Sequence, residues 1–255
     1  MGDDSRFARS RAGDDFSTTE IELIDGRRVA VRLVVNPRAR HVSVRIDPTR
    51  RIAIATAPSK RHLKSAADFA AERAGWIAHE LARIPEHVSL LPGVMAPLRG
   101  VMHELVFERG RGAARIEPPM FDDAPPRLVA PAPDTDLFEA RVIRFFKSEA
   151  KADLTARVRE FSETLGVRAG RLQVKEIRSR WGSCSADGAL AFSWRVILAP
   201  PFVLDYLAAH ETAHLKEMNH SRRFWAQVKK ALPDFERGRA WLDAHGAALH
   251  AIAAN

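Results

Sequence analysis

Short segments of alternating or largely apolar residues dominate the chain after residue 16. Residues 21–24, 29–35, 41–46 and 51–56 have the pattern that is typical of β-strands. Asp25-Gly26 separates the first two segments, and this dipeptide favours a tight hairpin turn. Because the four segments follow one another closely, the pattern predicts a four-stranded antiparallel sheet.

A helical pattern replaces the strand pattern after Pro58-Ser59. Apolar residues recur at helical spacing from Leu63 to Leu81, which predicts one long helix over residues 60–84. Residues 101–107 return to the pattern of a strand. This first part of the chain is therefore expected to be rich in β-structure, with one long helix.

A stretch rich in proline, glycine and aspartate follows at residues 108–136. It predicts a loop with short strands near residues 114–116 and 128–129. It is also the best position for a boundary between two halves. We therefore expect an N-terminal β-rich region at residues 16–135 and a second domain at residues 136–255.

Long helices are predicted for the second domain. Residues 137–165 have helical periodicity and form one helix or two in series, ended by Gly166. Another helix begins near Pro200-Pro201, since proline is tolerated in a first turn. A last amphipathic helix is predicted over residues 235–254.

A β-hairpin is predicted between these helices. Residues 171–177 alternate as a strand, residues 186–188 indicate a turn, and residues 189–197 follow as a second strand. Strands and helices occur in separate runs along the chain. The predicted fold class is therefore α+β, with an antiparallel β-rich first half.

His210, Glu211 and His214 form a His-Glu-x-x-His motif in the helix that begins near Pro200. Two helical residues at this spacing share one face, with Cβ atoms about 5–6 Å apart. Their imidazoles can both reach one Zn²⁺ ion at about 2.0–2.1 Å. Glu211 then lies beside the open coordination position and can take a proton from the bound water. The motif predicts one zinc ion with Glu211 as the general base.

A catalytic zinc ion needs a third protein ligand, and His220 is the best candidate. Asn219 can adopt the left-handed conformation that ends a helix. Ser221 can cap a following helix over residues 222–232. Glu236, further along the chain, is the alternative third ligand.

The spacing of the three histidines is that of a metzincin, but two features differ. Glu217 occupies the position of the metzincin glycine. No methionine follows Met218, which excludes a Met-turn. The motif therefore indicates a zincin of another branch.

A second motif, Arg-Ser-Arg-Trp-Gly-Ser-Cys-Ser, covers residues 178–185. Arg178 and Arg180 can share one face of a strand and bind a carboxylate or phosphate, or they are two solvated arginines. Gly182 permits a bulge or a close approach of the backbone. Cys184 is interpreted as a small buried residue rather than a nucleophile or a metal ligand, since no Cys-x-x-Cys accompanies it.

Composition adds information about location and partners. The 255 residues include one cysteine, which excludes an intramolecular disulfide and favours a reducing compartment. The polar residues 1–15 predict a disordered tail without a secretory signal, and no apolar run is long enough to span a membrane. We therefore expect a cytoplasmic protein. The net charge of +8 favours anionic partners, but the basic residues show no clustered stripe and are expected to be spread over the surface.

The motifs together resemble the YgjP-like metallopeptidase family, which is related to SprT-like and M48-type zincins. The resemblance is carried by Arg-Trp-Gly-Ser-Cys-Ser at residues 180–185, Trp-Arg at 194–195, His-Glu-x-x-His at 210–214 and Asn-His-Ser-x-x-Phe-Trp at 219–225. It implies a zincin-like second half in which a β-hairpin borders the cleft over the zinc helix. It also implies His210, His214 and His220 as ligands and Glu211 as the base.

Three functions remain open at this point. The first is a zinc metallopeptidase, with Arg178, Arg180, Trp181, Arg222 and Tyr206 as candidate substrate-binding residues. The second is hydrolysis of a phosphoanhydride, such as that of a nucleoside triphosphate, on the same site, although the sequence has no glycine-rich phosphate loop. The third is a zinc-stabilised module that binds nucleic acid, against which the intact Glu211 argues.

Overall fold

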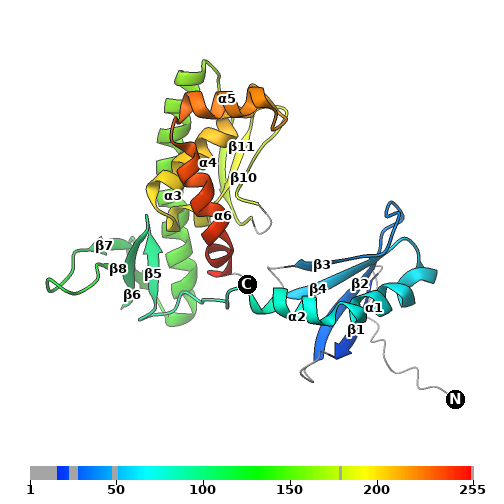
Figure 1. Cartoon of the computed structure of the whole chain (residues 1–255). Coiled ribbons are helices and arrows are strands. Elements are labelled where there is room, and N and C mark those ends of the chain that lie inside the picture. Colours follow the sequence, from blue (N-terminus) through cyan, green and yellow to red (C-terminus); the bar gives the residue numbers. More distant parts are fainter. Residues whose placement is uncertain (1–15, 23–27, 48–50, 178–179, 254–255) are drawn as a thin grey trace. The chain divides into compact units, whose positions relative to one another are not determined.

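The computed structural model describes residues 16–22, 28–47, 51–177 and 180–253. The predicted tail, the turn at Asp25-Gly26 and the side chain of Arg178 lie outside these residues. The chain divides into two compact units between Pro85 and Glu86, and each unit is described by itself (Figure 1). Among the described helices, none is long and apolar enough to cross a membrane.

The first unit contains a four-stranded sheet with the order β1-β2-β4-β3. Strands β1 and β2 are antiparallel, as are β3 and β4, but β2 and β4 run parallel. The prediction of a purely antiparallel sheet is corrected here. Alternation does not specify which strands pair, and β4, buried along most of its length, takes an inner position. The strands are β1 Phe16–Glu22, β2 Arg28–Val35, β3 Ser43–Asp47 and β4 Ile52–Ala57.

Helices α1 (Leu63–Glu72) and α2 (Ala74–Ala82) pack on one face of this sheet and follow the 3₁₀ turn η1 (Lys60–His62). The predicted single helix over residues 60–84 is interrupted at Arg73, where φ is −101° and ψ is 16°. Gly75, two residues after Arg73, lowers the helix propensity at this point. Alanines dominate the contact with the sheet, so helices and strands approach closely. The buried residues of this core are Val31, Leu33, Ala53, Ala55, Ala57, Ala66, Ala70, Ala74 and Ile77.

The second unit is built around α3 (Phe138–Leu165), which contacts strands β8 and β9, the 3₁₀ helix η3, and helices α4 and α5, which carry the metal site. The helix is continuous and ends at Gly166, whose φ of 65° is left-handed, as the sequence predicts. A second four-stranded sheet, β5-β6-β8-β7, shares its core cluster, in which Leu105, Leu128 and Phe138 are buried. Its strands are β5 Met95–Leu98, β6 Val101–Arg109, β7 Arg115–Glu117 and β8 Arg127–Ala132.

This shared core explains why the compact units divide after Pro85 and not near residue 135. The proline-rich stretch that suggested a boundary contains strands β7 and β8, and β8 pairs in parallel with β6. The proline, glycine and aspartate residues of this stretch therefore belong to an irregular connection inside one unit, and not to a boundary between two domains. The apolar residues on either side of it are buried together.

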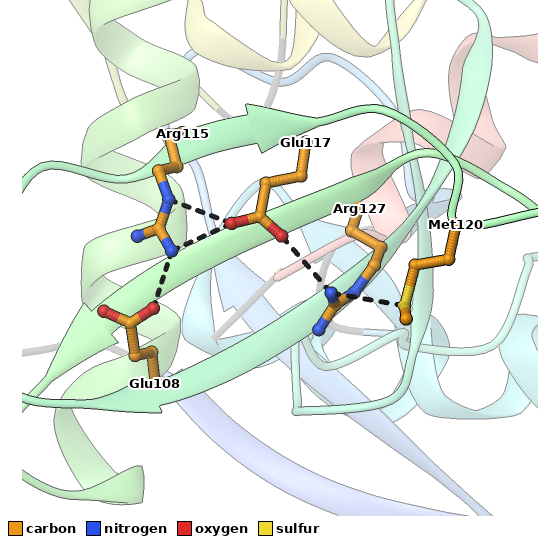
Figure 2. Close-up of polar contacts among 5 residues, drawn as sticks. All are labelled: Glu108, Arg115, Glu117, Met120 and Arg127. Carbon is orange, nitrogen blue, oxygen red and sulfur yellow. Dashed lines mark hydrogen bonds and ion pairs between the residues drawn. The ribbon is translucent and has the colours of Figure 1, made fainter.

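Charged side chains connect three strands of this second sheet (Figure 2). Arg115 on β7 donates to Glu108 on β6 at 2.7 Å and to Glu117 at 3.0 Å. Arg127 on β8 donates to the other oxygen of Glu117 at 3.2 Å and contacts the sulfur of Met120. The groups are substantially exposed, so water screens each pair and its contribution to stability is small.

A small third sheet has the order β10-β11-β9. Strands β10 (Gly182–Cys184) and β11 (Leu190–Ser193) form an antiparallel hairpin, and β9 (Leu172–Lys175) runs parallel to β11. The predicted hairpin of residues 171–177 with 189–197 is therefore wrong in its first strand. The predicted second strand ends at Ser193, and residues Trp194–Leu198 form a 3₁₀ helix, η3, in which all five residues are buried.

Three further helices complete the unit: α4 (Pro201–Ala213), α5 (Arg222–Ala231) and α6 (Phe235–Ala251). Their positions agree with the predicted helices, including proline in the first turn of α4. Helix α4 contacts α3, α5, α6 and strand β10. It is therefore the element on which the surrounding elements converge, and it carries the His-Glu-x-x-His motif.

Candidate metal centre

His210 lies in the last turn of α4, and His214 is the residue at its C-terminal cap. Their ring centroids are 5.0 Å apart. Both side chains are partly buried, and both face the loop that joins α4 to α5. The helical spacing in the sequence thus places two imidazoles on one face at the end of the helix, as expected for positions four residues apart.

His220 reaches the same point from the connection between α4 and α5. Its ring centroid is 5.0 Å from that of His210 and 4.8 Å from that of His214. One nitrogen from each of the three rings lies within 4.8 Å of the others. The chain turns without the expected left-handed Asn219: among the described residues, positive φ outside glycine occurs at Arg51, Arg99 and Ala253. Ser221 does cap α5, since its hydroxyl accepts from the backbone N–H of Phe224 at 3.4 Å.

The three imidazoles have the chemistry and spacing of a metal site. Nε2 of His210 and Nε2 of His220 lie 3.0 Å apart. Two nitrogens that each lie about 2.0–2.1 Å from a tetrahedral zinc ion are about 3.3 Å apart, so this pair fits. Nδ1 of His214 donates to the carbonyl of Glu217 at 3.1 Å, which leaves its Nε2 lone pair free to bind.

Burial favours the neutral form, which binds metals, at His210 and His214. Burial, and then the neighbouring His214 and His220, lower the pKa of His210 to about 3. Burial also lowers the pKa of His214. A ligating imidazole must be deprotonated, so the site is prepared to accept a cation without first losing a proton.

Phe224 on α5 forms a common wall behind the three histidines. Its ring centroid is 4.9 Å from that of His210, 4.5 Å from that of His214 and 4.7 Å from that of His220. The side chain is fully buried. Sequence reasoning did not single out this residue as part of the site. The sequence feature that indicates its role is its position three residues after the helix cap at Ser221. At this position the side chain of Phe224 points back toward α4.

Glu211 is the buried carboxyl group of the site. Its side chain is 5% exposed, and its Oε2 has no hydrogen-bond partner among the described residues. Burial raises the pKa of Glu211 to about 7, and the positive charge of Arg180 opposes this shift. An unpaired buried carboxyl beside neutral imidazoles is costly for stability, which is typical of a group retained for chemistry.

Strand β10 crosses directly over this carboxyl group at Gly182. A Cβ atom added to Gly182 would lie 2.4 Å from Oε1 and 2.7 Å from Cγ of Glu211. The second sequence motif and the metal motif therefore meet at one point. The glycine is required by the contact, since only a hydrogen fits between the strand and Glu211.

The effect of a methyl group at this position is a testable prediction. Because the atoms in conflict belong to a flexible side chain, Gly182→Ala should displace Glu211 and leave the fold intact. We expect hydrolase activity to fall roughly 100-fold, the cost of a misplaced reacting group. Zinc content and the melting temperature should change little. Ser183→Ala in the same strand is the control, and full activity in Gly182→Ala would refute the contact.

The other candidate residues fall into separate groups. Arg180 is exposed and acts electrostatically on Glu211. Arg222 is exposed in the first turn of α5. Trp181 packs against α6, with its ring centroid 4.0 Å from that of His250. Glu236, the alternative ligand, is exposed on α6, and the described metal cluster contains histidines alone.

Tyr206 and Cys184 support the surroundings of the site. Tyr206 is buried, its hydroxyl is 3.5 Å from Nδ1 of His210, and Gly238 of α6 packs against its Cβ. Burial raises the pKa of Tyr206 to about 12. Burial also raises the pKa of the Cys184 thiol, with further contributions from Glu211 and Asp187. A thiol with a raised pKa is a poor nucleophile. Cys184 is partly buried, not fully buried as the sequence interpretation had it.

Comparison with known proteins places this geometry in context. The sequence matches the profile of the family described as YgjP-like, metallopeptidase domain, over residues 40–245. No curated protein matches the chain. Among solved structures, the metallopeptidase zymogen of Pyrococcus abyssi abylysin resembles 38% of this chain and 94% of its own, with 23% sequence identity and a TM-score of 0.34. That likeness is too distant to support a conclusion about the site.

Proposed function

Because the chain belongs to the YgjP-like metallopeptidase family, whose members are metal-dependent hydrolases, we propose that it is a zinc peptidase centred on His210, His214, His220 and Glu211. One observation carries this proposal. Three imidazoles converge beside a buried carboxyl group whose Oε2 has no partner among the described residues. A purely structural zinc site has a closed ligand shell and no need for such a group.

The roles of the residues follow from their positions. Bound zinc supplies a Lewis acid that polarises the scissile carbonyl and acidifies water. Glu211 accepts a proton from the attacking water at its carboxylate and returns it to the leaving amine nitrogen. Burial of the carboxyl group raises its pKa, which favours transfer of a proton to it, and a bound cation would act in the opposite direction. Glu217 and Tyr206 orient the imidazoles of His214 and His210 through their Nδ1 atoms.

Arg180 is the best candidate to stabilise the developing oxyanion. Its charge already acts on Glu211, and its exposed guanidinium can turn toward a substrate. Strand β10 supplies a place for the peptide backbone. Within the described residues β10 pairs with β11 alone, so its outer edge is open to an added strand next to Gly182.

Assays with two classes of substrate, proteins and nucleoside triphosphates, distinguish this proposal from phosphoanhydride hydrolysis. The zinc-loaded protein should cleave casein, and this activity should disappear with a chelator and return with added zinc. Nucleoside triphosphates, incubated under the same conditions, should remain intact. Turnover of a nucleotide without cleavage of casein or peptides would replace the peptidase proposal with the phosphoanhydride alternative.

The third ligand gives a prediction that does not depend on the substrate. His220→Ala should lower zinc affinity by more than about 100-fold, the upper end of the loss seen when only a supporting residue is removed. Isothermal titration with zinc and the metal content of the purified protein measure this effect. His245→Ala, which removes an exposed histidine of α6, is the matched control. Unchanged zinc affinity in His220→Ala would exclude it as a ligand.

A further inference from the structure

A groove of about 520 Å³ lies between helix α3 and strand β9, and none of the candidate metal ligands lines it. Arg144, Lys147 and Lys151 of α3 form one wall. Arg171, directly before β9, and Lys175, the last residue of β9, form the other. No carboxylate and no aromatic ring lines the groove. Five of the 40 lysines and arginines of the chain therefore line one groove.

We call this surface, lined by the five cations, the basic groove. Among the described residues, none of the five forms an ion pair. Other arginines of this unit are paired: Arg99 contacts Glu149 at 2.9 Å and Asp153 at 2.8 Å on α3. Glu176, next to Lys175 in sequence, accepts from Trp194 and Arg195, and its carboxylate also interacts electrostatically with Lys147. The acidic residues of α3 that pair with Arg99 serve another side of the helix, so five cations face the one nearby carboxylate of Glu176 and the groove keeps a net positive charge.

The spacing of the cations favours a ligand with regularly repeated charge. Positions 144, 147 and 151 share one face of α3 and lie about 4.5 and 6 Å apart along its axis. Arg171 and Lys175 are about 13 Å apart along an extended strand. A single small anion can contact only part of these two rows. A polyanion lying along the groove can contact both.

We propose that the basic groove binds the phosphodiester backbone of nucleic acid. Charges along each strand of a DNA duplex repeat about every 3.4 Å, so a row of cations on a straight helix meets several phosphates at once. The absence of aromatic side chains from the walls leaves no platform for stacked bases. Binding is therefore expected through the backbone, without sequence preference. The net charge of +8 adds long-range attraction.

Salt-dependent DNA binding tests this proposal on the full chain. Fluorescence anisotropy with a labelled duplex of about 30 base pairs should show binding whose logarithm falls linearly with the logarithm of salt concentration. Lys151→Gln/Arg171→Gln, which removes one exposed cation from each wall, should reduce the salt slope by about 2 and weaken binding at least about 10-fold. Lys151→Arg/Arg171→Lys keeps both charges and should bind like the wild type.

A charge-matched control separates the groove from net charge. Lys229→Gln/Lys230→Gln removes two exposed cations from α5 and should leave the salt slope within about 0.5 of the wild type. Equal losses in the groove and control variants, or no DNA binding by the wild type, would overturn the proposal. Displacement of DNA by polyglutamate at equal charge concentration would also overturn it, because the partner would then be an acidic protein.

Discussion

Replacement of Glu211 by glutamine should abolish most hydrolysis while leaving the metal in place. Glutamine keeps the size of the side chain but cannot accept the proton of the attacking water. We expect kcat to fall about 10²–10⁴-fold, the usual contribution of a positioned acid–base group. The buried carboxyl group also carries an uncompensated cost in the folded protein, so the melting temperature should stay the same or rise.

Initial rates of peptide cleavage, zinc content and thermal unfolding measure the three parts of this prediction. Glu236→Gln is the matched control, because Glu236 is an exposed acid on α6 and was the alternative ligand in the sequence. Its activity and zinc content should equal those of the wild type. If Glu211→Gln retained full activity, the general base would have to be another group.

The second large effect is expected on stability, from the buried Arg195. Its side chain is 1% exposed, and it donates to the carbonyls of Ile252 at 2.8 Å and Ala253 at 2.7 Å at the end of α6. It also pairs with Glu176, which accepts from Trp194 at 2.6 Å. One arginine therefore connects η3, the residue after β9 and the C-terminal end of α6, which packs beside the metal helix.

Removal of this arginine should destabilise the protein by roughly 1–3 kcal/mol for each of the two carbonyls that lose their donor. Glu176 adds little, because it is 36% exposed and keeps its hydrogen bond from Trp194. Arg195→Met, which keeps the length of the side chain, is the appropriate variant, and urea unfolding measures the change. Arg168→Met, at an exposed arginine, is the control and should change stability by less than about 0.5 kcal/mol. A change in Arg195→Met as small as that of the control would show that the buried network contributes nothing.

Local sequence patterns predicted the helices of the second unit well. Gly166, Pro201 and Ser221 act at single positions through φ or a cap hydrogen bond, so their effect can be recognised without knowing the fold. The positions of His210 and His214 follow from helical spacing for the same reason. The meeting of these imidazoles with His220 also agrees with the prediction of a three-histidine cluster.

Interactions between distant segments could not be predicted in this way. Nothing in the alternation of residues 171–177 specifies a parallel partner in β11, and nothing in Trp194–Leu198 shows that all five residues are buried. The contact of Gly182 with Glu211 joins two motifs almost thirty positions apart, and only the folded chain brings them together. Clustering of cations between α3 and β9 has the same origin, since the two walls come from separate segments.

Anomalous diffraction at the zinc absorption edge, from crystals of the zinc-loaded protein, tests the central claim most directly. We predict one strong peak about 2.0–2.1 Å from a ring nitrogen of each of His210, His214 and His220, with the carboxyl group of Glu211 nearby but not coordinated. A peak at another place, or zinc coordinated by Glu211 or Glu236 in place of one of these histidines, would contradict it.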